Sequence, residues 1–157
     1  GTRGLILAFD TIVVLDGRIL GKPEDLDEAR SMLRDLSGRE HQVITGVAVR
    51  EDGAEASLTF SVSTPVDMRV LDEDAIESWV GEGELLGCAG AYNIERHLAS
   101  VELDQCYQNV AGLPLCHLYR ELRDSGLAPE YIISPVMTCD TTRGVTCQLG
   151  PEIVSSS

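Results

Sequence analysis

The chain has 157 residues and a formal net charge of −14, with 43% hydrophobic and 24% charged residues. This composition is typical of a soluble globular protein, and no apolar stretch approaches the ~18 residues needed to span a bilayer. The acidic balance argues against nucleic-acid polymers and acidic membranes as partners, because both bind basic patches. No secretory signal is visible at the N-terminus, so we expect a cytoplasmic protein, although an upstream targeting segment stays open.

The first elements form a predicted strand, hairpin and helix. Residues 4–15 are rich in aliphatic and β-branched side chains, and the following Asp16-Gly17 pair is a strong signal for a two-residue hairpin. Pro23 suits the first turn of a helix. Apolar residues then recur at helical spacing up to the Ser37-Gly38 stop, namely Leu26, Ala29, Leu33 and Leu36.

The middle of the chain predicts a second hairpin and a second helix. Residues 41–50 and 55–63 are strand-like and flank a turn at 51–53. Asp72 can cap a short helix that presents an apolar face of Ile76, Trp79 and Val80.

The remaining elements are a strand, a helix and a tail. A glycine-rich stretch over 81–95 precedes a predicted strand at 98–104, and Pro114 opens a helix that Gly126 closes. Residues 128–157 form an ambiguous C-terminal extension whose serine-rich end we expect to be disordered. With no linker or internal repeat, the pattern predicts a single α/β domain over 1–157 with a mixed β-sheet flanked by helices.

The five cysteines lack the spacing of a known metal or redox motif. Their number is odd and no CxxC pair occurs, so we interpret them as free thiols. Cys139 and Cys147 flank a short segment and leave a disulfide or metal loop as the less favoured alternative. The five are Cys88, Cys106, Cys116, Cys139 and Cys147.

Asp10 is an unusual residue for its place in the sequence. It interrupts the apolar run over 4–15, where an unpaired buried carboxylate would be costly. It therefore lies at a solvated strand edge or has a functional role, and residue type alone favours the solvated edge.

Four segments in order resemble the Maf family of nucleoside triphosphate pyrophosphatases, also called septum-formation-inhibitor-like proteins. They are "DTIVVLDGRILGKP", "LSGREHQVITGVAV", "GAYNIE" and "NVAGLPL", and the resemblance runs from about Leu7 to Leu122. It implies an elongated, mixed, Maf/ITPase-like sheet with two lobes around a nucleotide cleft. It also implies hydrolysis of a nucleotide between the α and β phosphates, assisted by Mg²⁺ or Mn²⁺, and a link to cell-division control.

Two departures from the family pattern matter. The family's phosphate-binding "SxSPRR" turn has no counterpart in this sequence, so the chain resembles a member that lacks the N-terminal segment. Loss of that segment would leave an unpaired sheet edge, which favours self-association as a homodimer. The family's "GAYGIQG" is here "GAYNIER", and Glu95 replaces a glutamine that the family uses in substrate selection.

The resemblance assigns roles to particular residues. Asp10 becomes the catalytic residue, as metal ligand or proton acceptor, which reverses the preference from residue type alone. Thr11 matches a position linked to substrate specificity, and Lys22 matches a lysine that contacts phosphate. The other substrate-binding candidates are Thr45, Arg69 and Glu95.

Further residues of the matched motifs have structural interpretations. We expect His41 to be a structural hydrogen-bonding residue, and Gly112 and Pro114 to make a turn and start a helix.

The resemblance implies a nucleoside triphosphate as substrate, and Thr11 favours the family's pyrimidine branch (dTTP or UTP) over the branch that acts on a methylated guanine nucleotide. A second hypothesis is a nucleotide-binding or protein-binding relative that has lost turnover, which Glu95 would support. A third, more distant hypothesis is a redox or metal protein that uses the cysteines.

Overall fold

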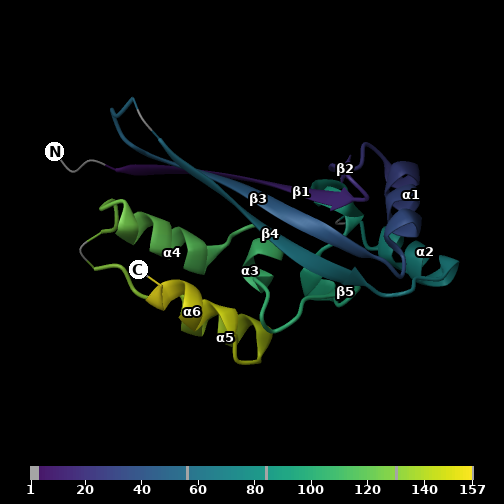
Figure 1. The fold of residues 1–157 in the computed structure, drawn as a ribbon. Coiled ribbons are helices and arrows are strands. Elements are labelled where there is room, and N and C mark those ends of the chain that lie inside the picture. Colours follow the sequence, from purple (N-terminus) through teal and green to yellow (C-terminus); the bar gives the residue numbers. More distant parts are fainter. Residues whose placement is uncertain (1–3, 56, 84, 130, 157) are drawn as a thin grey trace. The chain divides into compact units, whose positions relative to one another are not determined.

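The structure is a computed structural model that describes residues 4–55, 57–83, 85–129 and 131–156. Its elements are five strands and six α-helices with short 3-10 turns between them (Figure 1). The strands are β1 (Leu5–Leu15), β2 (Arg18–Leu20), β3 (Glu40–Glu51), β4 (Leu58–Met68) and β5 (Ala99–Ser100). The helices are α1 (Leu26–Leu36), α2 (Glu73–Gly81), α3 (Tyr107–Val110), α4 (Leu115–Asp124), α5 (Val136–Arg143) and α6 (Leu149–Ser155).

The strands form one sheet in the order β2-β1-β3-β4-β5. The predicted α/β class is confirmed, but the sheet is antiparallel where we expected a mixed one. The physical reason is that β1–β2 and β3–β4 are joined by short turns, which only antiparallel neighbours allow. The strand predicted over 98–104 shrinks to the two residues of β5, which pair with Asp67 and Met68.

The chain divides into two compact units. One contains the described residues of Gly1–Asp10, Thr45–Val62 and Leu103–Ser157, and the other contains Thr11–Ile44 and Ser63–Glu102. The three long strands β1, β3 and β4 each contribute residues to both units.

In the unit containing Thr11–Ile44, helix α1 begins after Asp25, whose carboxylate accepts hydrogen bonds from the backbone N–H groups of Asp27 and Glu28. Pro23 therefore lies before the helix rather than in its first turn. The predicted apolar face is buried except for Leu26, which is exposed, while Met32 joins the buried set.

Helices α1 and α2 of this unit pack side by side (Figure 1). Asp72 caps α2 by accepting a hydrogen bond from the Ala75 N–H, and the predicted face of Ile76, Trp79 and Val80 is buried. Two bidentate ion pairs join the helices, from Arg30 to Glu77 and from Arg34 to Glu73. The hydrogen bonds from these arginines lower the pKa of both carboxyl groups.

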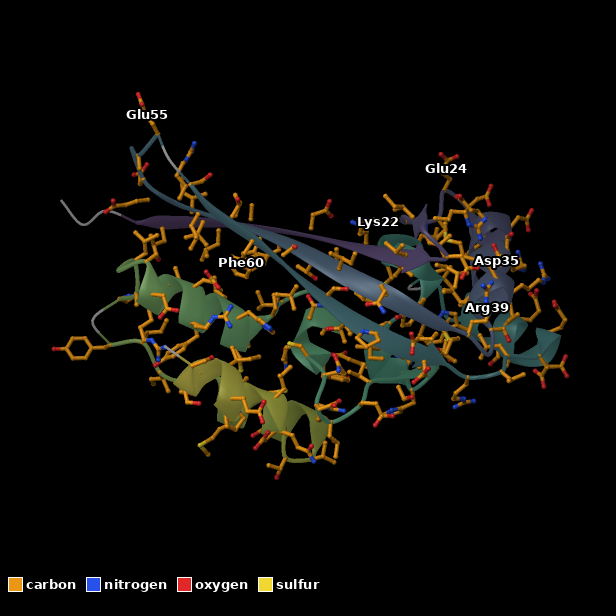
Figure 2. The ribbon with its side chains drawn as sticks, in the orientation of Figure 1. Lys22, Glu24, Asp35, Arg39, Glu55 and Phe60 are labelled. Atoms are coloured by element: carbon orange, nitrogen blue, oxygen red, sulfur yellow. The ribbon has the colours of Figure 1, made fainter. Side chains whose placement is uncertain are left out.

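In the unit containing Leu103–Ser157, the core is built on β3 and α4. Val47, Val49, Leu118 and Leu122 form a buried cluster, and partly buried side chains pack against it, including Phe60 of β4 (Figure 2). Helix α4 lies beside α6 (Figure 1). The extension from 128 thus contains two helices that the sequence left unassigned, and α6 continues to Ser155, while Ser157 lies outside the described residues.

The outer side of β1 is paired over a short length in the described strands. β2 covers only Val13–Leu15, and the N-terminal part of β1 exposes Ile6, Leu7 and Phe9. This is the place where the predicted open edge would lie, and self-association through it stays a prediction.

None of the described helices combines the length and the apolar character that crossing a membrane requires.

Candidate active site

The hairpin that leads to Lys22 has the geometry that its sequence predicts. Asp16 and Gly17 both have positive φ angles, of 49° and 78°, as a two-residue type I′ turn requires. The turn aligns Leu15 with Arg18 and Val13 with Leu20, and the chain then passes through Gly21 and Lys22 toward α1.

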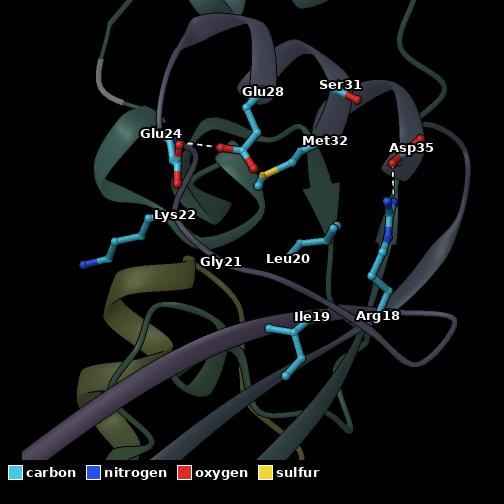
Figure 3. A pocket seen from close by; sticks show the side chains of 10 residues that line it. All are labelled: Arg18, Ile19, Leu20, Gly21, Lys22, Glu24, Glu28, Ser31, Met32 and Asp35. Carbon is cyan, nitrogen blue, oxygen red and sulfur yellow. Dashed lines mark hydrogen bonds and ion pairs between the residues drawn. The ribbon is translucent and has the colours of Figure 1, made fainter.

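Residues 18–24, which we call the return segment, and α1 line a pocket of about 390 Å³ (Figure 3). Arg18 and Lys22 are its cations, and Arg18 is engaged in an ion pair with Asp35. The Glu28 carboxylate accepts a hydrogen bond from the Glu24 N–H at 2.6 Å, which ties the return segment to α1. The remaining lining residues are Ile19, Leu20, Gly21, Ser31 and Met32.

Lys22 is the single lysine of the sequence, and the structure exposes it. Its amine points away from the Arg18–Asp35 ion pair (Figure 3). Since the lining contains two cations against the three carboxylates of Glu24, Glu28 and Asp35, the local charge alone does not favour a polyanion.

The "GAYN" segment is held directly against the residue that precedes Lys22. The Gly90 N–H donates a hydrogen bond of 3.0 Å to the Gly21 carbonyl. Gly90 has a φ of 68°, and a Cβ atom there would lie 3.0 Å from Cγ2 of Val13, so only glycine fits without displacing β1.

Two hydrogen bonds from side chains hold the same segment, and we call Gly90–Tyr92 with these bonds the clamp. Trp79 of α2 donates its indole N–H to the Ala91 carbonyl at 2.9 Å, and the Tyr92 hydroxyl is hydrogen-bonded to Nε2 of His41 at 2.7 Å. Burial lowers the pKa of His41 and raises the pKa of Tyr92. The buried His41–Tyr92 pair fits the structural role expected for His41.

Glu95 follows this clamp and is exposed. It lies in a 3-10 turn, η3 (Ile94–Arg96), where Asn93 caps the first residues by accepting a hydrogen bond from the Glu95 N–H at 2.9 Å. The backbone of Glu95 is thereby fixed while its carboxylate stays accessible.

Arg69 follows β4 and is exposed, and one nitrogen of its guanidinium is engaged within the protein. Its Nη1 donates a hydrogen bond of 3.2 Å to the His97 carbonyl, and its backbone bonds to Gly38 and Leu98. The guanidinium carries further N–H donors, so this bond does not by itself prevent a substrate contact by Arg69.

Asp10 and Thr11 are consecutive residues of β1. Asp10 is exposed, which satisfies both interpretations that the sequence allows, a solvated edge and a reactive carboxylate. Thr11 is half-buried. The compact units divide between these two residues, so Asp10 belongs to one unit and Lys22 to the other.

Thr45 is fully buried, and its hydroxyl donates a hydrogen bond of 3.1 Å to the Asn109 carbonyl. Its side chain therefore serves the packing of its own unit, and we leave it out of the site proposed below.

The described residues contain no group of three or more His, Cys, Asp or Glu side chains that could hold a metal ion. A nucleotide-bound Mg²⁺ uses only one or two carboxylates, because phosphate and water oxygens complete its shell. The exposed carboxylate of Asp10 fits that limited demand.

Arg18 is a pocket residue that the sequence reasoning missed. The Asp16-Gly17 turn fixes the hairpin register, so counting from it would have placed Arg18 on the same short return segment as Lys22. The bond between Gly21 and Gly90 joins residues 69 positions apart and has no local signal.

Comparison with known proteins supports the motif-based assignment. The chain is 43% identical over 126 residues to a dTTP/UTP pyrophosphatase of Carboxydothermus hydrogenoformans, covering 79% of this chain and 68% of that protein. Proteins with the same name from Pelotomaculum thermopropionicum and Syntrophomonas wolfei are 44% and 46% identical, covering 78% and 79% of this chain and 65% and 67% of theirs. The match thus spans about two thirds of each relative. The family model described as Maf-like protein matches residues 2–125, and the chain belongs to the Maf family.

Proposed function

We propose that this chain hydrolyses a pyrimidine nucleoside triphosphate, dTTP or UTP, to the monophosphate and pyrophosphate. The observation that carries the proposal is the agreement among the relatives: eight matches, at 37–46% identity, are all named dTTP/UTP pyrophosphatase. The exposed Asp10 and Lys22 supply side chains suited to this chemistry.

In this reaction a water oxygen forms a bond to the α-phosphorus, and the bond from that phosphorus to the α–β bridging oxygen breaks. The attacking water loses a proton, and pyrophosphate leaves. Phosphoryl chemistry of this kind depends mainly on positioning and on neutralising charge. Asp10 would accept the proton or hold a metal ion, and Lys22 would contact a phosphate oxygen.

A divalent cation, Mg²⁺ or Mn²⁺, fits the charge balance. The chain carries a net charge of −14, and the pocket beside Lys22 has more carboxylates than cations. A triphosphate would be repelled unless a bound cation offset part of its charge. When bound, the metal would neutralise charge on the phosphates, with Asp10 as its ligand from this chain.

The substrate base would be selected through Thr11 and Glu95. An ionised carboxylate accepts hydrogen bonds but cannot donate them, whereas the family glutamine does both. We expect Glu95→Gln to change the ratio of kcat/KM for dTTP and UTP by about tenfold, the equivalent of one hydrogen bond to a charged group. An unchanged ratio would remove Glu95 from base selection.

The second candidate is a Maf relative that binds nucleotide or a protein partner without turning nucleotide over. Glu95 favours it, because the substitution lies at the position linked to substrate choice. Nucleotide binding by titration calorimetry in the absence of any product release would support this alternative.

The central test is product analysis with each of the common nucleoside triphosphates, with Mg²⁺ or Mn²⁺ and with chelator. We expect monophosphate and pyrophosphate in equal amounts, preference for dTTP or UTP, and loss of activity on chelation. Release of orthophosphate without pyrophosphate would contradict the proposal.

Asp10→Asn removes one charge and keeps the side-chain shape, and we expect turnover to fall by at least ~10²-fold. The matched control is Asp104→Asn, since Asp104 is also an exposed aspartate and has no assigned role. Wild-type turnover of the Asp10 variant would return Asp10 to a solvated edge carboxylate.

Lys22 offers a test that does not depend on activity. Because it is the single lysine of the sequence, Lys22 and the chain's amino terminus are the two amines that an acylating reagent can modify. Nucleotide with Mg²⁺ should slow modification of the peptide containing Lys22, measured by mass spectrometry, while the amino terminus serves as internal control. Equal rates with and without nucleotide would argue against phosphate contact by Lys22.

A further inference from the structure

Four of the five cysteines converge on one small cavity in the unit containing Leu103–Ser157. Cys106 precedes α3, Cys116 lies in α4, Cys139 lies in α5, and Cys147 lies two positions before the first residue of α6. All four are buried, although they are up to 41 positions apart in the sequence. The family match ends at residue 125, so Cys139 and Cys147 lie in the segment beyond it.

Among the four, Cys139 and Cys147 are tied to one another through Asp140, the residue that follows Cys139. Two hydrogen bonds hold Cys147: its N–H donates to Oδ1 of Asp140 at 2.7 Å, and the Gly150 N–H donates to its sulfur at 3.2 Å. The residue after Cys139 therefore holds the backbone of Cys147 in place.

The cavity favours sulfur–sulfur chemistry over ligand binding. Its volume is about 10 Å³, which is close to the minimum for a single water molecule. Among the residues that the structure describes, the cysteines form no group of three suited to a metal ion. The metal alternative considered for the loop between Cys139 and Cys147 thus has no support from the geometry.

We propose that Cys139 and Cys147 are a reversible thiol–disulfide pair that links α5 to the start of α6. The oxidant is a low-molecular-weight disulfide of the glutathione class. One cysteine thiolate attacks the reagent and releases one thiol, which leaves a mixed disulfide on the protein. The second thiolate attacks the protein sulfur of that mixed disulfide and releases the other thiol. Two protein thiols are oxidised, one reagent disulfide is reduced, and the two protons go to the released thiols.

The same packing makes the pair slow to react. Burial raises the pKa of Cys139 to about 12, and burial likewise raises the pKa of Cys116 to about 11. Since only the thiolate reacts, oxidation should be slow at neutral pH and should accelerate with pH by up to about tenfold per unit. This distinguishes the pair from an exposed redox sensor that responds at once.

Tryptic peptide mapping identifies the linked pair directly. The reduced, folded chain is incubated with oxidised glutathione, its remaining thiols are alkylated, and it is then denatured and digested without reductant. Cys139 falls in the peptide 124–143 and Cys147 in 144–157, whereas Cys106 and Cys116 share the peptide 97–120. We expect peptides 124–143 and 144–157 to be joined, at a mass two hydrogen atoms below their sum, and to separate on reduction. A disulfide within peptide 97–120 would overturn the proposal. So would consumption of the free thiols without a link between peptides 124–143 and 144–157.

Single variants provide the control. Cys139→Ser should abolish the link and leave a glutathione adduct on Cys147, whereas Cys116→Ser, which alters a thiol lining the same cavity, should leave the link intact. Loss of the link in the Cys116 variant, with the fold retained by circular dichroism, would contradict the assignment. If the Cys139 variant does not fold, the wild-type peptide map still decides the question.

Discussion

Gly90 is a position at which adding a single methyl group should lower the free energy of unfolding strongly. Its φ of 68° is disfavoured for any residue with a side chain, by about 1–2 kcal/mol. An added Cβ would also lie 3.0 Å from Cγ2, 3.2 Å from Cβ and 3.3 Å from Cγ1 of Val13. Val13 is a buried, β-branched residue of β1 with little freedom to move away, so overpacking adds about 1–3 kcal/mol.

We therefore expect Gly90→Ala to lower the free energy of unfolding by about 2–5 kcal/mol, a large part of the total stability of a typical domain. Urea denaturation followed by Trp fluorescence measures this change. Gly83→Ala separates the two contributions, because Gly83 has a φ of 78° but nothing within 4 Å of the added Cβ. Gly87→Ala, which has neither constraint, should change stability by no more than about 0.5 kcal/mol.

The contact with Val13 can be isolated by a double-mutant cycle. Combining Val13→Ala with Gly90→Ala removes the two methyl groups that the new Cβ would meet, so the double variant should be more stable than additivity predicts, by about 1–2 kcal/mol. If Gly90→Ala costs no more than Gly83→Ala, the close approach of the "GAYN" segment to β1 is not tight, and the argument for this glycine fails.

Three further predictions concern other parts of the molecule. Thr45→Val should lower stability by about 1 kcal/mol through the lost hydrogen bond to the Asn109 carbonyl, while KM stays unchanged; a large rise in KM at unchanged stability would instead make Thr45 a substrate contact. Burial lowers the pKa of His41, so the unfolded chain takes up that proton first. The contribution of His41 to the free energy of unfolding is then fully present above about pH 6.5 and is lost as the pH drops below it. His41→Gln should flatten this pH dependence in denaturation measured from pH 7.5 to 5.5. Leu7→Lys places a charge on the sparsely paired part of β1 and should reduce any dimer seen by light scattering; dimerisation unaffected by the charge would exclude this edge as its interface.

Local signals account for the parts of the fold that the sequence predicted. The Asp16-Gly17 turn, the Asp72 cap and the stop at Gly38 each act over a few residues, and each element forms where its signal lies. The sequence did not predict α5 and α6, because such weakly periodic segments depend on tertiary packing, here of α6 against α4 and of α5 against α6. The strand predicted over 98–104 failed for a similar reason, since only two of its residues find a partner on β4.

The candidate site shows the same division between local and distant causes. The burial of Thr45 was predictable, because alternation along β3 puts it on the same face as Val43 and Val47. The family resemblance had given it a substrate role that the strand pattern does not favour. The convergence of the cysteines on one cavity was not predictable, because four separate elements have to pack before the thiols meet.

Two of the three departures in the "GAYNIER" segment, Asn93 and Glu95, have different physical consequences. Asn93 stands where the family pattern has glycine, yet its φ of −117° is an ordinary extended value, so the substitution introduces no backbone strain. Its side chain even caps the following turn through the Glu95 N–H. The backbone at Glu95 is therefore held by its own cap and by the clamp from Gly90 to Tyr92. Any difference in substrate choice at this position must then come from the carboxylate itself, since a rigid turn presents it.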